Sequence, residues 1–152
     1  MTPDTVEILL VEDDPRDVRL TLSALENARL QNKAQVARDG EEALDLLFYR
    51  GFHSGRSAQP AKLILLDLKL PKVDGLEVLR EIKSHPETRS IPVVMLTSSG
   101  EEKDMLESYK LGVNSYVQKP VDFDQFRDTI RALGFYWLVV NRPPPDEDFG
   151  SQ

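Results

Sequence analysis

The chain of 152 residues has no cysteine, which excludes disulfide bonds, thiolate metal sites and thiol catalysis. It also lacks long hydrophobic runs. No stretch approaches the roughly 18 apolar residues that a membrane span requires, so a membrane-spanning helix is not expected. The N-terminal residues do not form the pattern of a secretory signal peptide, since Asp4 and Glu7 precede an apolar run that is far too short. These absences predict a cytoplasmic protein that does not associate with a membrane.

Positive charge is scarce relative to negative charge. Nineteen Lys and Arg residues stand against 26 Asp and Glu residues, which gives a formal net charge of −7 at pH 7. Nonspecific nucleic-acid binding takes its affinity from Lys and Arg on phosphates, so this balance argues against a DNA-binding protein. The hydrophobic fraction of 40% and the charged fraction of 30% are typical of a globular protein.

Short apolar runs alternate with longer amphipathic segments along most of the chain. We predict five strands, at residues 6–11, 34–38, 63–66, 91–96 and 115–117. One helix is predicted after each strand, and these five helices lie at residues 15–28, 43–51, 75–84, 101–111 and 122–140. Strand–helix alternation predicts an α/β fold, a doubly wound parallel sheet with helices on both faces.

The predicted elements end shortly before the C-terminus. We expect residues 1–140 to form one domain and residues 141–152 to form a tail. The tail contains three prolines followed by three acidic residues, which is typical of a stiff segment followed by a disordered one. Glycine, serine and proline within residues 52–60 predict a loop before the third strand.

Polar side chains follow four of the predicted strands. Glu12 and Asp13 follow the first strand, Asp67 the third, Thr97 ends the fourth, and Lys119 follows the fifth. In parallel sheets ligands bind outside the carboxyl ends of the strands, so we expect these side chains to converge on one edge.

The residue types at this edge suit phosphate chemistry. Three carboxylates in one place repel one another, and a bound divalent cation would relieve the repulsion. Mg²⁺ fits best, because it prefers oxygen ligands and is usually held by one or two carboxylates with phosphate and water. A carboxylate can attack phosphorus to form an acyl phosphate, whose charge the Thr97 hydroxyl and the Lys119 ammonium would share.

Each of these residues alone has a simpler explanation. Glu12 and Asp13, with the acid that follows them, are also typical of residues that cap a helix, and Thr97 is compatible with an ordinary turn. The combination favours the phosphate interpretation, because the simpler explanation would have to hold at four strand ends.

The sequence resembles the receiver domain of two-component response regulators from about residue 6 to residue 133. The motifs that carry the resemblance are Leu10-Val11-Glu12-Asp13, Leu65-Leu66-Asp67-Leu68-Lys69-Leu70-Pro71 with Asp74-Gly75, Val94-Met95-Leu96-Thr97, and Tyr116-Val117-Gln118-Lys119-Pro120. This resemblance implies a flavodoxin-like fold with strand order 2-1-3-4-5. It also implies that Asp67 accepts phosphate from a phosphohistidine of a sensor histidine kinase.

The resemblance assigns the metal ligands. Glu12 and Asp13 form the acidic pair, and Asp13 and Asp67 are direct Mg²⁺ ligands together with the backbone carbonyl of Lys69. Glu12 stands where many members of the family have Asp, and we expect its longer side chain to act through water.

The resemblance also assigns the switch. Thr97 moves toward the phosphoryl group, Lys119 pairs with that group, and the Lys119–Pro120 bond is expected to be cis. Tyr116 occupies the position of the switch aromatic residue, which turns inward when Thr97 moves.

Within the family, the sequence is similar to the single-domain response regulators that partner bacterial phytochromes. Three features match that group: the long loop at residues 52–61, the Leu-Pro-Lys-Val-Asp-Gly segment at residues 70–75, and the aromatic residues 135–137. We therefore expect a phytochrome-type sensor kinase as partner and signalling by protein contacts.

Two other functions compete with this interpretation. A magnesium-dependent phosphohydrolase with an aspartyl-phosphate intermediate usually has a second acid two residues after the nucleophile, where this chain has Lys69. A receiver-like protein that only binds partners would have lost Asp67 or Lys119, and both are present. We expect a phosphoacceptor that catalyses its own phosphorylation and dephosphorylation, not a conventional enzyme.

The last predicted helix is apolar on more than one side. One stripe at helical spacing is expected to dock on the sheet, and it comprises Phe123, Phe126, Ile130, Leu133, Trp137 and Val140. Other apolar side chains would then point elsewhere, namely Phe135, Tyr136, Leu138 and Val139. We expect a homodimer built on this helix and the C-terminal extension. The alternative is that the tail folds back over the surface.

Overall fold

The computed structural model describes residues 7–27, 29, 34–48 and 61–145. Its strands are β1 (Ile8–Val11), β2 (Ala34–Ala37), β3 (Leu63–Leu66), β4 (Val93–Thr97) and β5 (Ser115–Gln118). They form one parallel sheet in the order β2-β1-β3-β4-β5, which confirms the predicted flavodoxin-like arrangement.

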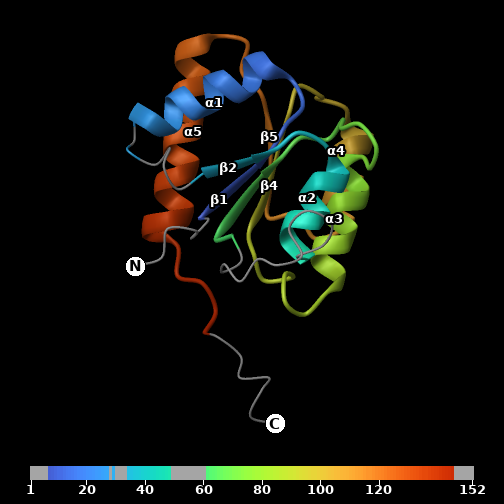
Figure 1. Ribbon diagram of the computed structural model, residues 1–152. Helices are drawn as coiled ribbons and strands as arrows, with labels where there is room; N and C mark the ends of the chain where they lie inside the picture. Colours follow the sequence, from blue (N-terminus) through green and yellow to red (C-terminus); the bar gives the residue numbers. More distant parts are fainter. Residues whose placement is uncertain (1–6, 28, 30–33, 49–60, 146–152) are drawn as a thin grey trace.

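Helices cover both faces of this sheet. They are α1 (Pro15–Asn27), α2 (Gly40–Phe48), α3 (Gly75–Ser84), α4 (Glu102–Lys110), α5 (Phe123–Phe135) and a π-helical turn, η3 (Tyr136–Val140). Figure 1 shows α1 and α5 on one face and α2, α3 and α4 on the other. Within the described residues, no helix is both long enough and apolar enough to span a bilayer.

The central strands are apolar on both faces because helices cover both. In β1, Leu9 and Val11 belong to the core beneath α2 and α3, whereas Ile8 and Leu10 belong to the core beneath α1 and α5. This alternation is the two-residue period of a strand. All of β1, β3 and β4 is buried, so the backbone at their carboxyl ends is held firmly.

Local sequence signals set the helix ends. The Asp14 carboxylate accepts a hydrogen bond from the Arg16 N–H at the start of α1, and Asp122 accepts one from the Gln125 N–H at the start of α5. Gly112 follows α4 with a φ of +99°, the left-handed conformation that glycine adopts without strain.

Some element boundaries differ from the predicted ones. β4 begins at Val93 instead of Ile91, because Pro92 has no N–H to donate to the sheet. α2 begins at Gly40, earlier than predicted. The predicted end of that helix near Gly51, the loop at residues 52–60 and the acidic end of the tail lie outside the described residues.

The predicted stripe on the last helix is partly wrong. Phe126 and Ile130 are buried against the sheet as expected, but Phe123 and Val140 are about half exposed, and Leu138 packs against the core instead. The cause of the change at Leu138 and Val140 is η3, where the Asn141 N–H donates to the Tyr136 carbonyl five residues earlier. This bonding changes the helical phase after Phe135 and rotates Leu138 toward the core.

Gly75 lies where α3 packs closely against the residues that follow β3. Its N–H donates to the Leu68 carbonyl at 2.8 Å, and an added Cβ would overlap the backbone carbonyl of Asp67. We expect Gly75→Ala to lower the free energy of unfolding by about 1–3 kcal/mol, measured by urea denaturation, because neither backbone segment can yield easily. The matched control is Gly100→Ala, where the added Cβ meets only the flexible side chain of Gln118. Equal destabilisation by both variants would contradict this account of Gly75.

Candidate functional site

The structure brings the predicted strand-end residues together at one edge of the sheet. Carboxylate oxygens of Glu12, Asp13 and Asp67 lie within 4.8 Å of one another. The Nζ atom of Lys119 lies 2.6 Å from Glu12 Oε1 and 3.7 Å from Asp67 Oδ2. Four side chains from three separate strand ends therefore form one charged cluster.

Backbone hydrogen bonds that continue beyond the strands fix these positions. The Glu12 N–H donates to the Ala37 carbonyl, and the Asp67 N–H donates to the Val11 carbonyl, each at 3.0 Å. The Lys119 N–H donates to the Thr97 carbonyl at 2.7 Å. These hydrogen bonds tie the backbone of Glu12, Asp67 and Lys119 to the sheet. The carboxylates therefore cannot move apart freely.

Glu12 is the most deeply buried member of the cluster, with a residue exposure of 3%. Its Oε1 accepts from Lys119, and its Oε2 accepts from the Asp14 N–H at 3.2 Å. Burial raises the pKa of Glu12 to about 7, and the nearby charge of Asp67 acts in the same direction. The hydrogen bond and charge of Lys119 oppose the rise without cancelling it.

Lys119 is held by more acids than the sequence predicted. Its Nζ atom lies 2.8 Å from Asp17 Oδ2, in addition to its contact with Glu12. Burial on its own would lower the pKa of this lysine, but hydrogen bonds to Asp17 and Glu12 and the charge of Asp67 hold the pKa above its usual range.

The Lys119–Pro120 bond is trans, so the predicted cis isomer is wrong. Trans is the intrinsically favoured isomer of such bonds.

Asp17 was missed by sequence reasoning, which looked for polar residues only at strand ends. It lies in the first turn of α1, four residues after Asp13. The available signal was this spacing, because α1 starts immediately beside the site.

Thr97 and Tyr116 are connected through Ser99. The Thr97 side chain is buried, and its Oγ1 accepts from the Ser99 N–H at 3.2 Å. The Tyr116 hydroxyl donates to the Ser99 carbonyl at 3.1 Å, while the Ser99 hydroxyl donates to Asp104 Oδ2 at 2.6 Å. Ser99 was not among the predicted site residues, yet it joins β4, β5 and α4.

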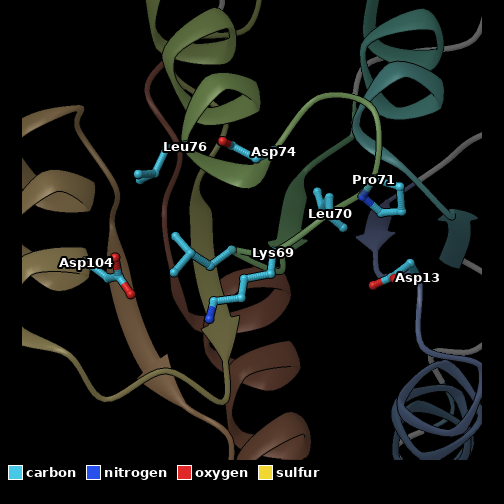
Figure 2. Close-up of a pocket in the computed structure, with 8 residues that line it drawn as sticks. Asp13, Lys69, Leu70, Pro71, Asp74, Leu76 and Asp104 are labelled. Atoms are coloured by element: carbon cyan, nitrogen blue, oxygen red, sulfur yellow. The ribbon is translucent and has the colours of Figure 1, made fainter.

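An open cleft of about 490 Å³ lies beside Asp13. The loop that follows β3 forms one wall through Lys69 and Pro71, and α4 contributes Asp104. Figure 2 shows Lys69 between Asp13 on one side and Asp104 on the other. The cleft therefore gives solvent access to the cluster at Asp13, whereas Glu12, Asp67 and Lys119 do not line it.

The donor set of this site suits a hard divalent cation. Glu12, Asp13 and Asp67 supply carboxylate oxygens at short mutual distances, and none of these residues offers nitrogen or sulfur. Oxygen-only sites of this kind select Mg²⁺, Mn²⁺ or Ca²⁺ over softer metals.

Comparison with known proteins agrees with the geometry. Residues 8–131 match the response regulator receiver domain family. The chain is a member of this family. The match decides against the phosphohydrolase alternative, and it confirms the resemblance that the strand-end motifs carry.

Known relatives of the receiver include phytochrome response regulators. Response regulator Rcp1 of Synechocystis is 41% identical over 86% of this chain and 88% of its own. The crystal structure of the phosphorylated cyanobacterial phytochrome response regulator RcpA is 40% identical, with a TM-score of 0.85 over 93% of this chain and 99% of that one. The bacteriophytochrome response regulator RtBRR is 57% identical, with a TM-score of 0.73 over 93% and 85% of the two chains. An Rcp1 structure with bound Mn²⁺ has a TM-score of 0.83 at 38% identity, over 92% of this chain and 99% of that one, so a relative binds a divalent metal.

The raised pKa of Glu12 predicts a specific pH dependence of stability in the metal-free receiver. The folded state binds a proton at Glu12 up to about pH 7, whereas the unfolded chain releases it near 4.5, so the stability present below pH 4.5 is lost progressively as pH rises to about 7. Glu12→Gln mimics the protonated form and should remove this loss, which we expect to be roughly 1–3 kcal/mol.

The measurement is urea unfolding of both proteins between pH 5 and pH 8 with a chelator present. The wild type should lose stability relative to Glu12→Gln as pH rises. A stability difference that stays constant with pH, or that grows in favour of the wild type, would rule out this description of Glu12.

Proposed function

We propose that the receiver accepts a phosphoryl group on Asp67 from a phosphohistidine of a sensor histidine kinase of the phytochrome type. The observation that carries the proposal is the meeting of Asp67 with Glu12, Asp13 and Lys119 beside an open cleft. Membership of the receiver family and the similarity to RcpA and RtBRR support the kinase partner.

The proposed reaction transfers a phosphoryl group from a histidine nitrogen of the kinase to a carboxylate oxygen of Asp67. A carboxylate oxygen of Asp67 forms the new bond to phosphorus, while the phosphorus–nitrogen bond breaks and its electron pair returns to the donor imidazole. The Leu68 N–H donates to Asp67 Oδ1 at 2.7 Å and so fixes the orientation of the carboxylate. The product is an acyl phosphate on Asp67.

The acidic residues of the site would hold the metal. Asp13 and Asp67 would bind Mg²⁺ directly with the backbone carbonyl of Lys69, and Glu12 would act through water. When bound, Mg²⁺ supplies positive charge that offsets the repulsion between Asp67 and an incoming phosphoryl group.

The proposed switch follows from the contacts of Thr97. In the phosphorylated state its hydroxyl and the Lys119 ammonium would share the charge of the phosphoryl group. The Thr97 hydroxyl would then leave the Ser99 N–H, which loosens the loop to which the Tyr116 hydroxyl is bonded. Tyr116 would turn inward, and the change would reach the surface of β5 and α5.

We further propose that the receiver forms residues 1–140, with residues 141–152 as a tail, and that it acts in the cytoplasm through protein contacts without binding DNA. The chain covers 85–99% of the compared response regulators, so the similarity extends over most of the length of each. Because Asp67 and its surroundings supply the reacting groups, the receiver would catalyse its own phosphorylation and dephosphorylation and would not be a conventional enzyme.

Phosphorylation by a small donor tests this proposal without knowledge of the kinase. We expect acetyl phosphate with Mg²⁺ to add one phosphate to the wild type, seen by intact-mass spectrometry, because the site itself provides the catalytic groups. Chelation of Mg²⁺ before the donor is added should prevent labelling. Asp67→Asn is the matched control, and labelling of this variant to the same extent as the wild type would show that Asp67 is not the acceptor.

We also propose that the receiver forms a homodimer through the end of the last helix. Phe135, Tyr136, Val139 and Val140 are between 48% and 64% exposed, an unusual density of apolar surface for one helix end. Pro143 and Pro144 line a separate hollow of about 330 Å³ with Trp137, at the start of β3 and β4. The described part of the tail therefore leaves this apolar surface uncovered, which favours a second copy as its occupant.

Light scattering tests the dimer. The wild type is expected to be a dimer at micromolar concentration, and Phe135→Ser combined with Val139→Ser is expected to be a folded monomer that still accepts phosphate. Leu106→Ser on α4 removes another exposed apolar side chain and should leave the dimer intact. A monomeric wild type, with and without phosphorylation, would refute the proposed interface.

A further inference from the structure

Asp17 places a fourth carboxylate beside the predicted site. Its Oδ2 lies 2.8 Å from Lys119 Nζ, and the Asp17 side chain is 19% exposed. The first turn of α1 holds it there, at the helix end nearest to the strand-end acids. This carboxylate differs from the other three, because it does not belong to the group of Glu12, Asp13 and Asp67 whose oxygens lie within 4.8 Å of one another.

The hydrogen bonds of Lys119 explain what Asp17 does. An ammonium group has three protons to donate. Two of them go to Glu12 Oε1 at 2.6 Å and Asp17 Oδ2 at 2.8 Å, whereas Asp67 Oδ2, at 3.7 Å, is beyond hydrogen-bond distance. Lys119 is therefore held mainly by two acids that do not receive the phosphate.

Among the residues that the structure describes, Lys119 is the only hydrogen-bond partner of the Asp17 side chain. Asp17 caps no helix and binds no other cation there. The Asp17 carboxylate therefore acts on the position of the Lys119 ammonium.

We infer that Asp17 is a positioning residue that holds Lys119 in the unphosphorylated receiver and competes with the phosphoryl group for it. The inference rests on the proposed phosphorylation of Asp67. A phosphoryl group on Asp67 adds negative charge near Lys119, and movement of the ammonium toward that charge lengthens its present contact with Asp17 or with Glu12. Asp17 thus stabilises the unphosphorylated arrangement relative to the phosphorylated one.

Binding of beryllofluoride, which mimics the phosphoryl group on a carboxylate, tests the inference. In the presence of Mg²⁺, Asp17→Asn should bind beryllofluoride roughly three- to tenfold more tightly than the wild type, the size expected for loss of one partly buried charge contact. The matched control is Asp14→Asn, which removes the same charge from the same helix end and keeps a capping side chain, but does not contact Lys119. Its affinity should change clearly less.

A second measurement separates the Asp17–Lys119 contact from general charge removal. In the Lys119→Met background, Asp17→Asn should no longer tighten beryllofluoride binding, because the two residues act through each other. Unchanged or weaker binding by Asp17→Asn in the wild-type background would overturn the inference. An equal gain in the Lys119→Met background would overturn it as well.

The outcome also distinguishes this inference from the proposed function. If the wild type fails to bind beryllofluoride with Mg²⁺, the assignment of Asp67 is wrong. A double-mutant cycle of urea unfolding on Asp17→Asn and Lys119→Met, without any ligand, then still reports whether the two side chains interact. If the wild type binds and Asp17→Asn binds equally, only the role of Asp17 is wrong.

Discussion

The repulsion among carboxylates at one end of a rigid sheet is the constraint on which the rest of this structure depends. Glu12, Asp13 and Asp67 lie within 4.8 Å of one another, and Lys119 is the ammonium group that contacts the cluster. Strands covered on both faces by helices have little freedom to spread, so the acids cannot relieve the repulsion by moving apart. The fold thus maintains an excess of negative charge that a cation can neutralise.

This constraint contributes to the raised pKa values of two neighbouring groups, Glu12 and Lys119. The pKa of Glu12 rises to about 7 because burial and a nearby acid penalise its charge, while the pKa of Lys119 rises because acids surround it. Both groups respond to the same excess of negative charge. Asp17 adds to that excess, and its contact with Lys119 shows that the ammonium is shared among acids before any phosphate arrives.

Sequence reasoning found the fold and the main cluster because both depend on local patterns. Unbroken apolar runs marked the buried strands, and the polar residue after each run marked the edge where ligands bind. The strand order came from the resemblance to receivers. The motifs around Asp67 and Lys119 also pointed correctly to the receiver family.

The features that sequence reasoning missed depend on three-dimensional geometry. Asp17 lies in the first turn of α1, and its contact with Lys119 joins residues 102 positions apart in the chain, which a search limited to strand ends did not cover. The packing of Leu138 depends on a π-helical turn, and a stripe at regular α-helical spacing placed Val140 there instead. The isomer of the Lys119–Pro120 bond was carried over from the family, and the structure has it trans.

The most direct test of the central constraint is the thermal stability of the receiver as a function of Mg²⁺ concentration, without any phosphate donor. If repulsion among these acids creates the cation site, the melting temperature of the wild type should rise with Mg²⁺, because the ion binds the folded cluster and not the unfolded chain. In Asp13→Asn, which removes one charge from the cluster, the metal-free protein should be more stable than the wild type and the rise should be much smaller. A melting temperature of the wild type that does not respond to Mg²⁺ at millimolar concentration would contradict the account.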